Sequence, residues 1–207
     1  MARVTGPLMS MDASGTVAGA IVFSRWKGLS YVRRHAIPNN PRAPKQVSVR
    51  AMMTFVSRAW GTSMIAVQAP WNLAAETQHM SGFNYFIGHA MSRWRTFRGP
   101  QEQLPNVPVT PLSDAPTVTV TGGVREATLS IAYGLVPPNW AWLVFAALGA
   151  PVTPAFSNLV GAFAYVSDPD VFVHTPIVPG VWHYTLFGMN TDGLFSLPSV
   201  DASDTVT

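Results

Sequence analysis

Cationic and aromatic residues gather in a short stretch near the start of the chain, at positions 25 to 34. Guanidinium and ammonium groups pair with carboxylates or phosphates, and aromatic rings offer faces on which other groups stack. This combination predicts a docking surface for an anionic partner, and a basic arm that follows directly would extend it. The predicted partner-binding residues are Arg25, Trp26, Lys27, Tyr31, Arg33, Arg34, Asn40, Arg42 and Lys45.

Two other interpretations of this cluster stay open. The first, which is less favoured than docking, is a solvated turn that has Trp26 packed beneath it. Interleaved bases and aromatic rings also bind nucleic acid, although no recognised nucleic-acid motif accompanies them here. A second basic group, Arg93, Arg95 and Arg98 beside Trp94, fits the outer side of a helix as well as it fits a binding surface. We therefore expect nucleic acid to be an improbable partner and a protein to be the favoured one.

The remaining polar residues show no pattern typical of catalysis or of metal binding. The histidines lack metal-ligand spacing, and the chain has no cysteine. Asp168-Pro169-Asp170 offers oxygens to calcium but lacks the glycine and distal glutamate of a calcium-binding loop, so a solvated turn is favoured. Neither a nucleophile elbow nor a glycine-rich phosphate loop is present. We predict no catalytic residue, no metal, no cofactor and no enzymatic activity.

Charge is divided between the two halves of the chain. Residues 1–111 carry twelve Lys and Arg against three Asp and Glu, whereas residues 112–207 carry one against seven. The halves therefore have formal net charges of +9 and −6, which agree with the +3 of the whole chain. Such an asymmetry indicates two modules that meet different surfaces, the first of them anionic.

The overall composition is poor in charge for a soluble protein. Charged residues make up 11% of the 207 residues and hydrophobic ones 48%, whereas roughly 25% charged is usual. This composition has two interpretations. In the first, part of the apolar surface is covered by a partner or by other copies of the chain. In the second, the protein is a well-packed β protein with a Thr-, Ser- and Asn-rich exterior. The apolar runs at 17–23 and 140–148 are too short for a secretory signal or a membrane span.

The first half of the sequence predicts a hairpin, an arm and three helices. Residues 16–23 and 29–35 are expected to form a β-hairpin, and the proline-rich residues 37–44 an extended arm that crosses a neighbouring subunit. Apolar residues at helical spacing predict helices over 45–60, 70–79 and 83–97. In the first of these helices Val49, Met52, Met53, Val56 and Trp60 form the expected buried stripe. We expect an α+β module over residues 1–100 and a proline-rich linker over 101–116.

The second half predicts an all-β sandwich over residues 117–207. Seven runs with period two are separated by turn-forming residues, which is typical of a Greek-key sandwich. The expected strands cover residues 118–121, 127–133, 140–147, 160–166, 171–177, 181–189 and 194–197.

This half resembles a fibronectin type III or bacterial immunoglobulin-like module. The resemblance rests on a proline-containing entry at residues 114–116, on Leu129-Ser130-Ile131 as a second strand, and on Gly180 with Tyr184 at the start of the sixth strand. It is completed by an N-x-D-G-x-x-S hairpin at residues 190–196. The usual single tryptophan of an early strand is represented twice, by Trp140 and Trp142. The resemblance covers nearly the whole half and implies a fold, not a function.

Residues 6–98 resemble a family of uncharacterised bacteriophage and prophage proteins. The shared motifs are ASGxxxG at 13–19, RWKGxxYVR at 25–33, NPR…Q…R at 40–50 and SGFNxF at 81–86. The resemblance implies a virion protein made in the host cytoplasm, not Sec-exported, without a membrane partner. Its expected partners are a phage capsid or tail protein and other copies of itself.

The expected place in the particle is head decoration or minor capsid protein. A tail or head–tail component is the first alternative and a nucleic-acid-binding packaging factor the second. An accessory that binds cell wall or glycan is the last.

Overall fold

A computed structural model describes residues 2–3, 15–17, 19–26, 29–36, 42–104, 114–134, 140–175 and 177–207. The chain divides into two compact units, Met1–Pro41 and Arg42–Thr207. The first unit holds one four-stranded sheet with the order β1-β4-β3-β2. Its strands are β1 (Ala2–Arg3), β2 (Gly15–Val17), β3 (Ile21–Trp26) and β4 (Leu29–Arg34). The predicted hairpin is therefore the centre of a small sheet, and the predicted arm falls on residues 37–41, outside the described residues, and on residues 42–44, which lead into the first helix.

Three helices open the second unit: α1 (Pro44–Thr62), α2 (Ile65–Glu76) and α3 (Gly82–Arg95). Ser81 caps α3 by accepting a hydrogen bond from the Asn84 N–H at 3.2 Å. The predicted helix at 70–79 is wrong at its start. Helix α2 begins at Ile65, and Pro70 lies inside the helix and not in its first turn. Proline has no N–H and cannot donate the usual backbone hydrogen bond. The packing of the buried Trp71 and Ala75 stabilises the helix in its place.

The predicted buried stripe of α1 is wrong at two positions. Met52 and Val56 are fully buried, as expected, but Val49 and Met53 are 37% and 38% exposed. Ser48 and Phe55 take their places on the inner face. Ser48 was overlooked because it is polar, and it is buried because its Oγ accepts a hydrogen bond from the Trp94 indole N–H at 3.1 Å.

The rest of the second unit is a sandwich of two antiparallel sheets. One has the order β5-β6-β9 and the other β11-β10-β7-β8, which is the strand order expected of a fibronectin type III-like sandwich. The strands are β5 (Thr117–Gly122), β6 (Ala127–Ala132), β7 (Ala141–Leu148), β8 (Leu159–Ala164), β9 (Asp170–His174), β10 (Gly180–Met189) and β11 (Ala202–Val206).

The last predicted strand, at 194–197, is wrong. That segment makes one isolated bridge, between Met189 and Phe195, and Phe195 packs its ring against Phe97 and Phe187. The true final strand is β11, which pairs with β10 from Ala202 to Val206. Its sequence is mostly small and polar and buries only Val206 well, so hydrophobic alternation did not reveal it.

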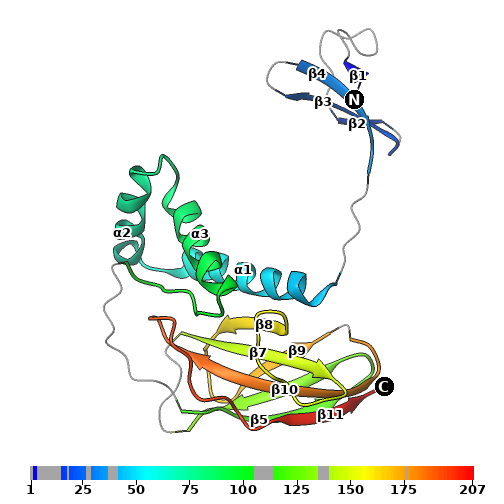
Figure 1. Ribbon diagram of the computed structural model, residues 1–207, viewed down its shortest axis with the longest axis vertical. Coiled ribbons are helices and arrows are strands. Elements are labelled where there is room, and N and C mark those ends of the chain that lie inside the picture. The colour runs from blue at the N-terminus through cyan, green and yellow to red at the C-terminus, as the bar shows by residue number, and fades with distance from the viewer. Residues whose placement is uncertain are drawn as a thin grey trace. The chain divides into compact units, whose positions relative to one another are not determined.

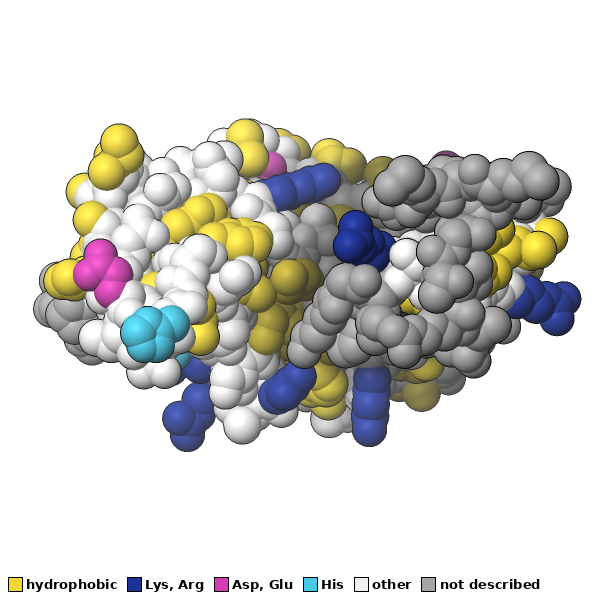
Figure 2. Space-filling view, turned by 90° about the horizontal axis from the view of Figure 1, so that it is seen from above, with side chains coloured by type: hydrophobic (Ala, Val, Ile, Leu, Met, Phe, Trp, Pro, Cys, Tyr) yellow, Lys and Arg dark blue, Asp and Glu magenta, His cyan; other side chains and the backbone are white. Residues whose placement is uncertain are grey.

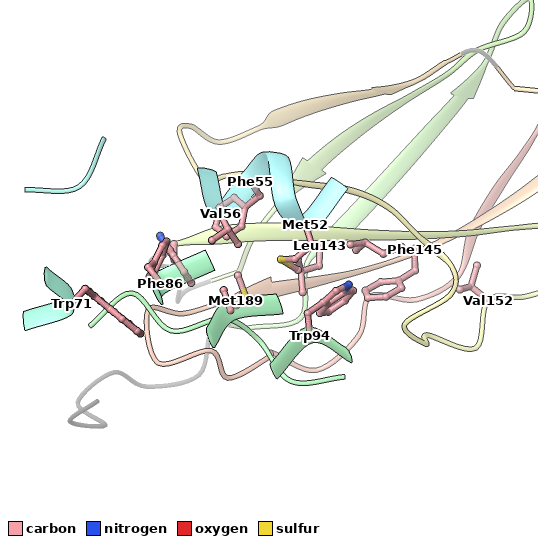
Figure 3. Close-up of a cluster of buried hydrophobic side chains, with 14 residues drawn as sticks. Met52, Phe55, Val56, Trp71, Phe86, Trp94, Leu143, Phe145, Val152 and Met189 are labelled. Carbon is pink, nitrogen blue, oxygen red and sulfur yellow. The ribbon is translucent and has the colours of Figure 1, made fainter. Parts of the chain in front are cut away.

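The hairpin and the helices belong to different compact units. Helix α1 and the end of α3 pack on the outer face of the sheet that contains β7, β8 and β10, and α2 packs on α3 (Figure 1). Strand β7 is buried along six consecutive residues, because its alternate side chains enter two different cores. Trp142, Val144 and Ala146 face the sandwich interior. Leu143 and Phe145 face the helices, where they meet Met52 and Trp94 (Figure 3). The α+β module expected at residues 1–100 is therefore divided, and its helices share a core with the sandwich.

The segment after α3 is also part of this body. Glu102 donates its N–H to the Thr191 carbonyl at 2.9 Å and accepts from the Trp71 indole N–H at 2.8 Å. A Cβ on Gly99 would lie 2.5 Å from the Gly193 carbonyl oxygen, so the two backbones touch. The first residues of the predicted linker are thus packed against the sandwich, and residues 105–113 lie outside the described part of the chain.

The predicted solvated turn at 168–170 contains a buried anchor. Asp170 is 7% exposed. Its Oδ2 accepts hydrogen bonds from the Trp142 indole N–H at 2.9 Å and from the Val166 N–H at 3.1 Å. Its Oδ1 accepts from the N–H and the hydroxyl of Ser167, each at 3.2 Å. The carboxylate therefore ties the turn between the two sheets to the central tryptophan of the interior.

A fragment of residues 114–207 should not fold as a stable monomer. Without the helices it would expose Leu143, Phe145 and Met189, at a cost of about 1.5–3 kcal/mol for each side chain. Residues 42–207 should instead unfold in one cooperative transition, as measured by circular dichroism during urea titration. A monomeric 114–207 fragment with a sharp transition and native-like near-ultraviolet signal would contradict the shared core.

Replacing Asp170 with alanine should lower the free energy of unfolding by about 2–4 kcal/mol, because four donors lose their partner and the indole N–H stays buried. Asp168→Ala is the matched control, since Asp168 is exposed and its loss should change stability by less than about 0.5 kcal/mol. Equal effects of the two substitutions in urea unfolding would argue against the anchoring role.

Candidate docking surfaces

The predicted docking residues centre on the hairpin formed by β3 and β4. Branched and aromatic residues (Ile21, Val22, Phe23, Tyr31 and Val32) favour extended backbone in both strands. The strands are antiparallel, with Ile21 opposite Arg34, Phe23 opposite Val32 and Arg25 opposite Ser30. The His35 N–H donates to the Ala20 carbonyl at 2.7 Å and closes the open end of the hairpin.

The register distributes the predicted residues over both faces of this sheet. Directly opposed residues of antiparallel strands share a face, and successive residues alternate. Arg25 and Arg34 therefore lie on one face, whereas Tyr31 and Arg33 lie on the other. The three arginines are exposed and Tyr31 is half-buried. The hairpin accordingly offers two basic faces and not the single cluster that the linear sequence suggested.

The other predicted residues are not brought into this hairpin by the structure. Arg42 and Lys45 belong to the second unit, where Arg42 precedes α1 and Lys45 lies in its first turn. Both are exposed. Lys27, Asn40 and the side chain of Trp26 lie outside the described residues. A continuous surface from residue 25 to residue 45 stays a prediction.

The N-terminal sheet has no buried side chain among its described residues. Its apolar residues Phe23 and Val32 are half-buried, and Ile21 is 42% exposed. Residues 1–41 contain five Lys and Arg and one Asp, a formal net charge of +4. A small sheet normally requires a hydrophobic face packed against another layer for stability. Within the described residues of its own unit, this sheet has no such layer.

Helix α2 presents an apolar surface that the sequence analysis did not identify. Met64, Ile65 and Leu73 are 77%, 83% and 68% exposed, while Trp71 and Ala75 of the same helix are buried. Glu76 is its only charged residue. The sequence contains the signal, because α2 has apolar residues on all its sides. A helix of this kind usually has neighbours on several sides. Figure 2 shows hydrophobic side chains interspersed with Lys and Arg, and few acidic ones, on the face that it draws.

The titratable groups of the sandwich form pairs, not a reactive cluster. His183 Nδ1, on β10, lies 2.7 Å from Oδ2 of Asp201, which directly precedes β11. His174 Nδ1 shares a hydrogen bond of 3.1 Å with the Tyr184 hydroxyl. Within the described ranges no three His, Cys, Asp or Glu side chains are grouped as metal ligands. No helix of the described residues is long and apolar enough to cross a membrane.

Two histidines are shifted toward their neutral form. Burial, followed by the positive charge of Arg93, lowers the pKa of His89; its Nδ1 is buried without a hydrogen-bond partner in the described structure. Burial also lowers the pKa of His174, from 6.5 to about 4. The His174 ring lies edge-on to Trp182 and Tyr184, and burial raises the pKa of the Tyr184 hydroxyl. His174 is therefore a neutral member of an aromatic cluster at the edge of the sandwich.

The burial of neutral His174 predicts acid destabilisation. Between pH 6.5 and about 4 the unfolded chain binds a proton at this position and the folded chain does not, so the free energy of unfolding falls as the pH falls. The loss from pH 7 to pH 5 should be about 2 kcal/mol in urea titrations. His174→Gln, which keeps a polar partner for Tyr184, should remove most of this dependence, and His35→Gln should preserve it. An unchanged pH dependence in the first variant would assign the effect to other groups.

Comparisons with known proteins add only a general likeness. No protein-family model matches the chain, and no curated protein matches it. Among solved structures, a β-1,2-glucanase from Parabacteroides distasonis aligns with 10% identity and a TM-score of 0.41 over 50% of this chain and 14% of its own.

Two separate small domains also align. An Fn3-like protein from Clostridium thermocellum has 14% identity, a TM-score of 0.33 and coverage of 47% of this chain and 96% of its own. The fibronectin type III domain of human fibronectin type III domain containing protein 3 has 11% identity, a TM-score of 0.33 and coverage of 49% and 92%. It is the order of the strands, and not these alignments, that defines the body as an α-helical layer on a fibronectin type III-like sandwich.

Proposed function

We propose that this protein is a structural component of a bacteriophage particle that acts by binding and not by catalysis. The observation that carries the proposal is the N-terminal sheet, which has a net charge of +4 over residues 1–41 and no buried side chain among its described residues. A sheet of this kind is suited to docking, because a partner would supply both the missing apolar layer and the opposite charge. The resemblance of residues 6–98 to phage and prophage proteins supports the choice of particle.

In this proposal the two units have separate tasks. The N-terminal sheet anchors the chain to a capsid or tail protein. The body of residues 42–207, with a complete core of its own, projects from the particle or meets a neighbouring copy. Its exposed apolar residues on α2 and its low overall charge are consistent with contacts between copies. Head decoration or a minor capsid position is our first choice, and a tail or head–tail position is the alternative.

The decisive measurement is the number of copies in purified particles of the phage that encodes the chain, determined by quantitative mass spectrometry. Decoration or a minor capsid role predicts on the order of tens to hundreds of copies, in keeping with the symmetric multiplicity of assemblies. A handful of copies would favour a tail or head–tail position. Absence from the particle would overturn the proposal. Retention on DNA that falls steeply with salt would instead support the packaging-factor alternative.

Charge reversal at the hairpin should prevent incorporation. Arg25→Glu with Arg34→Glu places two acidic groups on one face of the hairpin, against the expected acidic partner, and like charges across an interface cost several kcal/mol. We therefore expect at least about a tenfold drop in copies per particle. Arg58→Glu with Arg95→Glu, at exposed positions of the body helices, is the matched control. Both pairs should melt like the wild-type chain, and equal incorporation of the two pairs would remove the hairpin from the anchor.

A further inference from the structure

One face of the N-terminal sheet combines an apolar centre with cationic ends. Phe23 and Val32 are directly opposed on β3 and β4, and Ile21 lies beside them on the same face. Arg34 is opposite Ile21, and Arg25 lies beyond Phe23 opposite Ser30. The two arginines are exposed. The face is therefore a short apolar row with a guanidinium group at each end.

The space next to this row is open. Gly15 on β2 is opposite Phe23 and so belongs to the same face. A Cβ built on Gly15 meets no atom within 4 Å. Gly15 places no side chain directly opposite Phe23, so within the described residues this position leaves room for an apolar group from another molecule. Aromatic residues, phenylalanine included, are enriched in protein interfaces, which suits Phe23 to the role of an anchor residue.

The charge of the unit decides which class of partner fits this face. A second copy of the same sheet would oppose arginines to arginines, and like charges directly opposed are destabilising. Nucleic acid would neutralise the arginines through its phosphates. Phosphate contacts are polar, however, and would leave the apolar row of Ile21, Phe23 and Val32 without a partner. A protein surface with an apolar centre and aspartates or glutamates around it satisfies both features.

We propose that the Ile21–Phe23–Val32 face docks onto an acid-rimmed apolar surface of a different protein, and that the sheet gains its full stability only when docked. The identification of that protein as a component of the phage particle rests on the function proposed above. The docking face and the chemistry of its partner do not, because they follow from the strand register, the burial and the charge.

Site-specific cross-linking tests the choice of face. The full chain carries benzoylphenylalanine in place of Phe23 or, as the matched control, of its neighbour Val22 on the opposite face. Both variants are irradiated in phage-infected cells, so that the readout does not depend on incorporation into particles. We expect the Phe23 position to give at least tenfold more cross-linked product than the Val22 position. The product should be a second protein whose cross-linked peptide is apolar and flanked by Asp or Glu.

Any other cross-linking result overturns the inference. Products that shift with nuclease would identify nucleic acid as the partner, and products within this chain or between its copies would identify the chain itself. Equal or greater yield from the Val22 position would assign docking to the opposite face. The absence of any product from Phe23 would remove the face from all contacts. Absence of the chain from particles, with the expected cross-link still formed, would refute the proposed function and leave the docking face in place.

Hydrogen exchange of the free full-length protein tests the coupled stability. Amides of β3 and β4 should exchange at least about a hundredfold faster than those of β7 and β10, because the described residues of the small sheet include no buried side chain. The body strands, which are buried on both sides, serve as the internal reference. Protection of β3 and β4 equal to that of the body in the free protein would show that the sheet needs no partner.

Discussion

Strand β7 is the constraint on which the body of this protein depends. The buried residues of its first part, 141–146, alternate between the sandwich interior and the layer of helices, so that neither side of this part faces water. Two aromatic pairs illustrate the double burial: Phe145 lies with its ring 5.8 Å from that of Phe97 on the helix side, and Trp142 lies 6.2 Å from Tyr165 on the other side. Removing either neighbouring layer would leave a row of large apolar side chains in solvent.

The sequence predicted the sandwich because short alternating strands and turn residues are local signals. The same pattern failed at β11, where Ala202 to Val206 is polar and pairs with β10 through its backbone. It also failed to attach the helices to the sandwich. The unbroken apolar run of β7 contained that information, since a strand buried on both faces lacks polar alternation. By length the same run also predicts an ordinary strand, and the proline-rich stretch after α3 predicts a domain boundary.

The candidate docking residues were predictable by type but not by position. Three arginines and a tyrosine close together in sequence predict a surface for an anionic partner, and that surface stays a prediction. Which of them act together depends on the strand register, and that depends on which residues of β3 and β4 are opposed. Arg34 and Arg25 prove to share a face, while Arg33 lies behind them. The charge asymmetry between the two halves of the sequence is distributed over three parts of the structure. These parts are a basic sheet, basic helices and an acidic sandwich.

The attachment of the helices to the sandwich also bears on how such a gene exchanges parts with others. Immunoglobulin-like and fibronectin-like domains are usually treated as cassettes that can be moved between genes at their edges. Here a recombination event at codons 101–116 would separate Met52 and Trp94 from the strand that they cover. Both products would be left with half of a core. A crossover at codons 37–41, between the two compact units, would instead give intact products. The helices together with the sandwich therefore form the unit that such an exchange must keep whole, whereas residues 1–41 are a separate compact unit.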